Sequence, residues 1–466
     1  MTPTELAETS VRALTDGFRD GTLSPVEVLA ATLDHVEATN PAVNALFSIR
    51  PEEAMENARA SEARWKAGSP LGILDGVPMT VKDSVAMKGW PYYHGIAANR
   101  NAPPSSFDSP PAARLKETGA TIFAKTTMPD CGLLAAGVST MFGIVRNPWG
   151  RAFNTGGSSA GAGASLAAGM GFLSVGSDIA GSVRCPAGHC GLVSLKPTQG
   201  RIPHLMPEFM RSAGPLGRST EDIAFLMTVL SGFDERDPWS FPKDGTQYQD
   251  HLTRDVKGLR IGILTDMGFG PKPEAVVAAT VEAAGKALEA EGAIVTPFVS
   301  PLDSDCYEPI DRWLMIRGYA EWKSLPPHED HEFLHYVRDW CQPAKEMSAL
   351  DAWALLGEIT RMRAKLFAAF EGYDYVLAPT LPVVNFPAEE PGMFRDKPLG
   401  HTVFTAMFNQ TGQPASSVNF ALDERHLPIG VQVIGHRCDD LGVLQLTKTL
   451  EDLRGVTMDW PTVPRG

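Results

Sequence analysis

Short apolar runs alternate with longer amphipathic stretches along most of the chain. Runs of four to six residues predict buried strands, and a 3.6-residue periodicity predicts helices between them. The clearest unit is a strand over 259–264, a helix over 273–291 and a strand over 293–298. The other predicted strands cover residues 76–81, 120–124, 172–175, 375–378, 415–419 and 429–434. This alternation predicts an α/β fold with a large mixed, mostly parallel β-sheet sandwiched between helical layers.

Helix signals are strongest near the start of the chain. Ser24 is a predicted N-cap, with Pro25 at the first helical position and Glu27 completing a capping box. Asn40-Pro41 is predicted to end that helix. Residues 1–70 are therefore interpreted as helices packed on the outside of a larger body.

Two later segments need interpretation. The Gly/Ser/Ala-rich residues 156–170 are predicted to form a buried helix rather than a linker, because small side chains let neighbouring backbones approach closely. Residues 300–370 are helical in pattern, acidic and rich in tryptophan. They are either a helical cap over a site or helices clamped onto the sheet. With no repeat and no long linker, residues 1–466 are predicted to form a single domain.

The composition removes several classes of protein. The chain has 466 residues, of which 43% are hydrophobic and 21% charged, as in soluble globular proteins. A net charge of −14 argues against nonspecific binding to nucleic acid or to an anionic membrane. We find no apolar run of ~18 residues and no signal-peptide pattern at the N-terminus. A cytoplasmic protein with reduced cysteines, and with no nucleic-acid or membrane partner, is expected.

Common catalytic motifs are missing or misleading. There is no phosphate-binding loop, no HExxH and no paired CxxC. Cys185, His189 and Cys190 lie close together, but a zinc site needs about four ligands, so buried thiols are the favoured interpretation. Ser159 sits in a GxSxG match, yet a loop precedes it where a nucleophile elbow needs a strand. No metal and no cofactor are expected.

A turn of small residues is the better candidate for chemistry. The segment GSDIAGSVR (176–184) follows a predicted strand and contains Ser182. Consecutive turn amides can converge on a negative oxygen, and a serine at the end of such a turn is placed for acyl transfer. By itself the pattern is also typical of an ordinary turn.

The block GGSSAGAGASLAAG…GSDIAGSVRCPAGHCGLVSLKPTQGR (156–201) resembles the signature of the amidase signature enzymes. Further blocks match in order along nearly the whole chain. They are GVPMTVKDSV (76–85), KTTMPD (125–130), RNPW (146–149), GPLGRSTEDIA (214–224), APT (378–380) and NQTGQPASSVNF…LPIGVQVIG (409–435). The number and order of these blocks identify the chain as similar to that family and imply its fold.

The resemblance also implies the roles of individual residues. Ser182 corresponds to the nucleophile, Ser158 to the bridging serine after a cis peptide, and Lys82 to the base. Ser159 would help to fix the bridge by hydrogen bonding. The loop at Gly132 and Leu133, together with Ser158, corresponds to the substrate contacts. The oxyanion hole corresponds to the backbone amides of Ile179, Ala180, Gly181 and Ser182.

One position departs from the family pattern. Many members have glycine where this chain has Ala180. Alanine resists a positive φ, so either the turn keeps φ negative there or the hole is reshaped.

A lysine can replace histidine as base only when it is neutral. The free pKa of lysine is ~10.4, so Lys82 must be desolvated. Ser158 would relay the proton from Ser182 to Lys82 and later to the leaving amine. Taken alone, Lys82 could instead be a surface lysine paired with Asp83, and Ser158 could be a helix N-cap. Asp178 and Arg184 are interpreted as residues that orient the nucleophile turn.

The predicted function is hydrolysis of a carboxylic amide through an acyl-enzyme on Ser182. A carbamate, ester or anilide hydrolase is the alternative within the family, as is the amidase subunit of a glutamine-dependent amidotransferase. A non-catalytic binding protein is disfavoured by the intact lysine and serines. The expected partner is a small-molecule amide or carbamate, and the oligomeric state stays open, with a homodimer as one candidate. An apolar acyl pocket or a buried core is expected for Met206, Phe209 and Met210.

Overall fold

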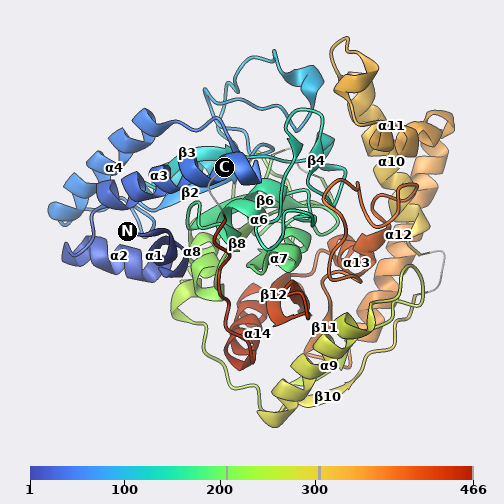
Figure 1. Cartoon of the computed structure of the whole chain (residues 1–466). Helices are drawn as coiled ribbons and strands as arrows, with labels where there is room; N and C mark the ends of the chain where they lie inside the picture. The colour runs from blue at the N-terminus through green and yellow to red at the C-terminus, as the bar shows by residue number, and fades with distance from the viewer. Residues whose placement is uncertain (206–207, 303–305, 464–466) are drawn as a thin grey trace.

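The computed structural model describes residues 1–205, 208–302 and 306–463. Its strands are β1 (Leu46–Phe47), β2 (Pro78–Lys82), β3 (Thr121–Thr126), β4 (Val138–Ser139), β5 (Gly143–Ile144), β6 (Leu173–Asp178), β7 (Val193–Lys196), β8 (Ser212–Gly217), β9 (Arg260–Ile263), β10 (Ile294–Pro297), β11 (Tyr375–Pro379), β12 (Ala415–Leu422) and β13 (Pro428–Ile434). Eleven of these described strands form one sheet in the order β1-β3-β2-β6-β8-β7-β12-β13-β11-β9-β10, which runs through the middle of the molecule (Figure 1).

Helices cover both faces of this sheet. They are α1 (Pro3–Glu8), α2 (Val11–Asp20), α3 (Pro25–Val43), α4 (Pro51–Lys66), α5 (Pro110–Glu117), α6 (Ala160–Ala167), α7 (Arg184–Cys190), α8 (Thr220–Leu230), α9 (Ala275–Ala290), α10 (Glu308–Ser324), α11 (His335–Cys341), α12 (Ala349–Phe370), α13 (Val403–Gln410) and α14 (Asp440–Leu453). Helices α5, α8, α9 and α14 share one apolar core with the sheet, and α6 and α7 pack on its other face. The predicted α/β class, with a large mixed sheet between helical layers, is confirmed.

The expectation of mostly parallel pairing needs correction. Within the eleven-stranded sheet of the described residues, four neighbouring pairs are parallel. Six are antiparallel. The antiparallel pairs run through the centre of the sheet, where β12 and β13 form a hairpin and β8 lies between β6 and β7. Alternation of strands and helices along a sequence does not reveal this spatial order, and β7 and β8 themselves escaped prediction.

The N-terminal helices lie on one flank of the molecule (Figure 1). Ser24 caps α3 as predicted, because its side chain accepts hydrogen bonds from the backbone amides of Val26 and Glu27. The predicted end at Asn40-Pro41 is wrong by one turn. The helix continues to Val43 with Pro41 inside it, and Asn44 ends it with a φ of 58°.

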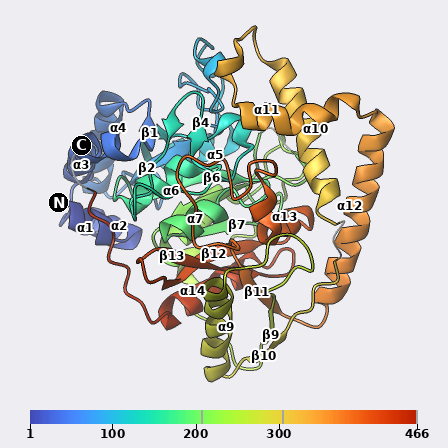
Figure 2. The ribbon, with the colours of Figure 1, turned by 45° about the vertical axis from the view of Figure 1, so that its right-hand side comes forward.

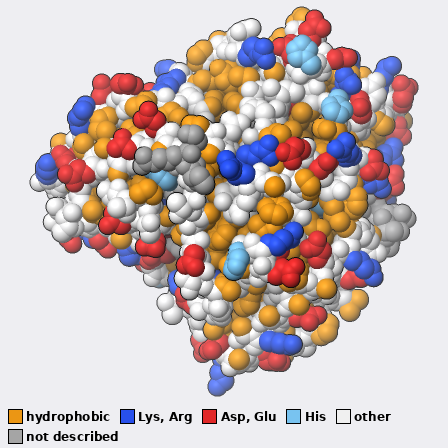
Figure 3. Space-filling model, in the orientation of Figure 1, with side chains coloured by type: hydrophobic (Ala, Val, Ile, Leu, Met, Phe, Trp, Pro, Cys, Tyr) orange, Lys and Arg blue, Asp and Glu red, His pale blue; other side chains and the backbone are white. Residues whose placement is uncertain are grey.

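Helices α10, α11 and α12 form the opposite flank (Figures 1 and 2). Leu314 of α10 belongs to the same apolar cluster as Val376 of β11, so these helices pack against the body of the sheet. None of the described helices is long and apolar enough to cross a membrane. Basic and acidic side chains are interspersed on the face seen in Figure 3, with no continuous basic patch.

Candidate functional site

Strand β2 delivers Lys82 at its last residue, and the side chain is completely buried. Its Nζ lies 2.7 Å from Ser158 Oγ, in hydrogen-bond distance. Ser177 Oγ, 3.4 Å away, and the Ser177 carbonyl, 3.5 Å away, are further contacts. Ser177 also approaches Ser84 Oγ at 3.3 Å and belongs to the site, although no motif pointed to its side chain.

Ser158 sits in the loop before α6. The Gly157–Ser158 peptide is cis, as the family resemblance implied. The predicted helix over 156–170 is therefore shorter than expected, since α6 begins at Ala160 and its cap position is Ser159. Ser158 is not the helix N-cap, which leaves its hydroxyl available to Lys82.

Ser182 follows β6 and lines the same small cavity as Lys82 and Ser158. The Ser159 amide donates a hydrogen bond to the Ser182 carbonyl over 3.0 Å, which ties the two serine loops together. The expected side-chain role of Ser159 needs correction, because its Oγ is buried without a hydrogen-bond partner among the described residues. The structure records a hydrogen bond between Lys82 and Ser158 and none between Ser158 and Ser182.

The turn before Ser182 presents backbone amides. Gly181 has a φ of 116°, whereas Ala180 does not have a positive φ, so the substitution of glycine by alanine fits this turn. The Gly181 amide donates to Asp178 Oδ1 over 2.8 Å. Within the described part of the chain, the amides of Ile179, Ala180 and Ser182 have no recorded acceptor. Three of the four amides expected to form the oxyanion hole are thus free to bind another oxygen.

A buried ion pair holds this turn. Arg184 donates to both carboxylate oxygens of Asp178, over 3.0 and 2.9 Å, and neither side chain is exposed. Asp178 also accepts from the Val183 amide, and Asn409 of α13 donates to it over 2.8 Å. Burial is the largest single influence and raises the pKa of Asp178, but the charge and hydrogen bonds of Arg184, together with the Asn409 hydrogen bond, keep the pKa below its ordinary value. The carboxylate stays charged and fixes the shape of the turn.

The environment of Lys82 favours the neutral amine. Burial lowers its pKa well below the ordinary value, and the nearby charge of Arg211 lowers it further. Asp178 and Asp83 oppose this shift, more weakly. The alternative of a surface lysine paired with Asp83 is excluded, because the ion pair of Asp83 is made with Lys125, at 3.7 Å.

Two arginines and a loop complete the cavity. Arg211 and Arg317 line it together with His94, Met128 and Cys131. No motif pointed to Arg211, Arg317 or His94, whereas Met128 lies in the KTTMPD block. In this structure the cavity has a volume of about 10 Å³, room for about one water molecule.

Of the two loop residues expected to contact substrate, only Gly132 lines the cavity. Gly132 lines the cavity with a φ of 66°, and a Cβ there would lie 3.2 Å from Ser158 Oγ. Leu133 is buried in an apolar cluster instead and does not line the cavity. Met210 belongs to the same cluster, Phe209 packs edge-on against Trp313, and Met206 lies outside the described residues.

Among the described residues, one group of side chains brings potential metal ligands together. Ligand atoms of His94, Cys131 and Glu321 lie within 4.8 Å of one another. Arg317 is ion-paired with Glu321 at 2.6 Å, and this adjacent positive charge disfavours a cation. Cys190 is buried, burial raises the pKa of its thiol, and the Sγ contacts the Thr155 carbonyl, in agreement with a buried thiol rather than a ligand.

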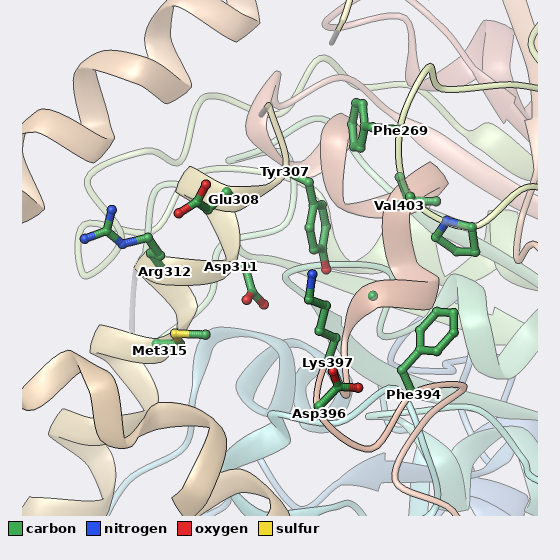
Figure 4. A pocket seen from close by; sticks show the side chains of 13 residues that line it. Phe269, Tyr307, Glu308, Asp311, Arg312, Met315, Phe394, Asp396, Lys397 and Val403 are labelled. Atoms are coloured by element: carbon green, nitrogen blue, oxygen red, sulfur yellow. The ribbon is translucent and has the colours of Figure 1, made fainter. Parts of the chain in front are cut away.

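A much larger cavity of about 710 Å³ lies on the other side of α10 (Figure 4). Tyr307, Asp311 and Met315 line it, whereas Arg317, two residues beyond Met315, faces the cavity of the candidate site. Two residues span about 200° of a helix, so α10 separates the two cavities. The lysine and serines of the candidate site do not contribute to the larger one.

Comparisons with known proteins identify the family to which the chain belongs. A family model described as Amidase matches residues 27–444. The chain is 30% identical to an acylamidase of Rhodococcus erythropolis, with 97% of each chain covered. It is 32% identical to an indoleacetamide hydrolase of Bradyrhizobium diazoefficiens, covering 94% of this chain and 85% of that one. The chain belongs to the amidase family, the amidase signature enzymes.

Related proteins differ in what they act on. One subunit of the glutamyl-tRNA(Gln) amidotransferase of Methylobacillus flagellatus is 30% identical, over 98% of this chain and 99% of that one. Among solved structures, a bacterial aryl acylamidase of the amidase signature family superimposes with a TM-score of 0.90 at 27% identity, covering 98% of both chains. A 6-aminohexanoate cyclic dimer hydrolase gives 0.89 at 27% identity, covering 98% of this chain and 99% of that one. The fold is shared by proteins whose names give different substrates.

Proposed function

We propose that this chain hydrolyses a carboxylic amide C–N bond through an acyl-enzyme on Ser182. Lys82 acts as the base and Ser158 relays the proton between them. The observation that carries this proposal is the 2.7 Å contact between Lys82 Nζ and Ser158 Oγ inside a buried cavity that Ser182 also lines.

The base must be uncharged to accept a proton. Burial supplies this condition, since it lowers the pKa of Lys82 well below its ordinary value. With a neutral amine, the Ser158 hydroxyl donates its proton toward Nζ and its oxygen can accept the proton of Ser182. The step needs Ser182 to approach Ser158 more closely than in this structure, and catalytic hydrogen bonds commonly tighten when substrate binds.

Apart from the amide, the reaction needs only water. Ser182 Oγ bonds to the amide carbon while its proton passes to Ser158 and the Ser158 proton to Lys82. The amine leaves with a proton returned by the same route, and a water molecule releases the acid. The negative oxygen of the intermediate binds the amides of Ile179, Ala180 and Ser182, since the Gly181 amide is engaged by Asp178.

The test is covalent labelling of the purified protein with a fluorophosphonate, followed by mapping of the labelled peptide. We expect a single adduct on Ser182 and turnover of simple anilides. An adduct on Ser159 or elsewhere, with turnover intact, would assign the nucleophile to another residue. Matched amide, ester and carbamate substrates decide which acyl bond the site prefers.

A second candidate function rests on the relatives named as subunits of glutamyl-tRNA(Gln) amidotransferase, which match almost the full length of the chain. In that case the chain would release ammonia from glutamine only within a complex. Glutaminase activity that appears only with co-purified partner chains would support this candidate. Full amidase activity of the isolated chain would support the lone enzyme.

A further inference from the structure

Arg211 is a half-buried cation whose guanidinium has few partners. It lines the cavity that holds Lys82, Ser158 and Ser182. Among the described residues no hydrogen bond or ion pair engages its guanidinium. Burial lowers its pKa, and the nearby charge of Arg317 lowers it further. A guanidinium offers five N–H donors, and those of Arg211 have no acceptor among the described residues, although the charges of Glu208 and Glu321 act on it from a distance.

Arg317 adds a second unsatisfied donor to the same cavity. Its Nε and one terminal nitrogen are ion-paired with Glu208 at 3.3 Å and with Glu321 at 2.6 Å. The other terminal nitrogen, Nη1, is buried and has no hydrogen-bond partner among the described residues. Glu208 and Glu321 each pair with Arg317 through one oxygen, and the other Glu321 oxygen is buried without a hydrogen-bond partner among the described residues. Neither carboxylate forms an ion pair with Arg211.

We propose that Arg211 and the free nitrogen of Arg317 form an anion-binding subsite, so that the preferred amide carries a carboxylate beside the bond to be cleaved. The inference rests on the proposed amidase function and names its substrate class. Guanidinium groups match the geometry of carboxylates and bind them with charge-assisted hydrogen bonds. The anion would satisfy donors that the protein leaves unpaired.

A competing explanation gives Arg211 a purely electrostatic role, since its charge also lowers the pKa of Lys82. The two explanations differ in what a change of Arg211 does. If Arg211 acts only on the pKa of Lys82, its substitution slows the hydrolysis of every substrate to the same degree. If Arg211 binds an anion, its substitution slows the hydrolysis of charged substrates more than that of neutral ones.

Three anilides separate these cases. Succinanilate carries a carboxylate on the acyl side. In 4-methylpentananilide an isopropyl group replaces that carboxylate, and the 3-carboxyanilide of 4-methylpentanoic acid places the charge on the leaving group. The measured quantity is the ratio of kcat/KM between a charged anilide and the neutral one, in which an equal effect on Lys82 cancels.

For the wild-type chain we expect one charged anilide to have a higher kcat/KM than the neutral one. Whether this is succinanilate or the 3-carboxyanilide shows whether the subsite binds the acyl side or the leaving group of the substrate. In Arg211→Gln that ratio should fall about 10- to 100-fold, the range of a charge-assisted hydrogen bond. Arg211→Lys should retain part of the ratio. The exposed Arg19, paired only with Asp16, provides the matched control Arg19→Gln, which should leave the ratio unchanged.

Binding gives an answer that does not depend on turnover. In the Ser182→Ala chain we expect succinanilate or the carboxyanilide to bind more tightly than the neutral anilide, and Arg211→Gln to remove the difference. If the charged anilide binds more tightly but the wild-type chain does not turn it over, the proposed amidase function is wrong and the anion subsite is supported. If turnover shows no preference for charge, or if the kcat/KM ratio is unchanged in Arg211→Gln, the anion subsite is wrong and the amidase function is unaffected.

Stability provides the last control. Because no described partner is left unpaired, Arg211→Gln should not lower the melting temperature. A clear drop, with the substrate ratio intact, would assign Arg211 a structural role and overturn the subsite.

Discussion

Lys82 and Ser158 meet at 2.7 Å, although 76 residues separate them in the chain. Lys82 ends β2, and Ser158 follows the cis peptide in the loop before α6. Both side chains are buried, at 0% and 3% exposure. Their contact couples an amine shielded from water to a hydroxyl beside Ser182, and several measurable consequences follow from it.

Replacing Lys82 by methionine should make the folded state more stable at pH 7. The pKa of Lys82 in the folded chain lies below its unfolded value of about 10.4. At a pH between these two values, Lys82 is protonated in the unfolded chain but not in the folded one. Wild-type stability therefore rises with pH through this window because of Lys82, and Lys82→Met lacks that contribution. The gain at pH 7 is about 1.4 kcal/mol for each unit of the pKa shift that lies above pH 7, less the loss of the Ser158 contact. Urea unfolding of both chains from pH 7 to 10 measures the difference, which should shrink as pH rises. A constant difference would mean that Lys82 does not titrate abnormally.

Ser182→Ala should abolish acylation and leave the fold intact. The side chain is small and has no recorded hydrogen bond, so little packing is lost. We expect no fluorophosphonate adduct, no turnover and a melting temperature within a few degrees of wild type. Measurable turnover by this variant would reject Ser182 as nucleophile.

Arg184→Met should lower both stability and rate. It leaves the buried carboxylate of Asp178 without its partner, a change that typically costs about 3–5 kcal/mol. The same carboxylate positions the Gly181 and Val183 amides, so kcat should fall as well. Arg236→Met, which removes an exposed pair with Asp234, is the control and should change neither by much. A stable, fully active Arg184→Met would show that the turn does not depend on the ion pair.

Gly181→Ala should damage the nucleophile turn. The added Cβ would lie 2.4 Å from Thr405 Oγ1 and 2.7 Å from Cys185 Sγ, at a φ that disfavours alanine. Gly245→Ala is the matched control, since Gly245 has a φ of 81° with nothing within 4 Å of the added Cβ. We expect Gly245→Ala to cost only about 1 kcal/mol and to retain activity. Gly181→Ala should lose more stability and at least tenfold in kcat, measured with an anilide. Equal losses of stability and kcat in the two variants would show that the close contacts of Gly181 do not matter for the turn.

Arg211→Gln should move the acid limb of the pH–rate profile to higher pH. The charge of Arg211 is second only to burial among the causes that lower the pKa of Lys82, so its removal raises that pKa. The profile of kcat/KM for the neutral anilide measures the shift. A limb that stays in place would show that Arg211 does not act on the base.

The sequence motifs predicted which residues lie together at the candidate site, whereas the hydrophobic pattern did not predict the order of the strands in the sheet. Lys82, Ser158 and Ser182 lie in segments that resemble a known family. The order of the strands was not predictable from alternation alone. β8 (SAGPLG) looks like a turn because of its glycines and proline, yet it is a fully buried strand between β6 and β7.

The wall of the cavity could not be predicted for a different reason. Arg317 belongs to an amphipathic helix whose charged residues look solvated in the sequence, and only the packing of α10 turns this one inward. Arg211 lies just before β8, in a segment with no motif. Which side chains surround the site depends on how distant segments pack, and no local pattern carries that information.

The central claim is that a neutral Lys82 draws the proton of Ser182 through Ser158. The rate at which a fluorophosphonate labels Ser182, measured from pH 5 to 10 in the wild-type chain and in Lys82→Ala, tests it most directly. We predict a wild-type rate that rises through one deprotonation below the ordinary lysine pKa of about 10.4, and labelling of Lys82→Ala that is about 100-fold slower or more and lacks that step. The same profile and rate in both chains would contradict the account.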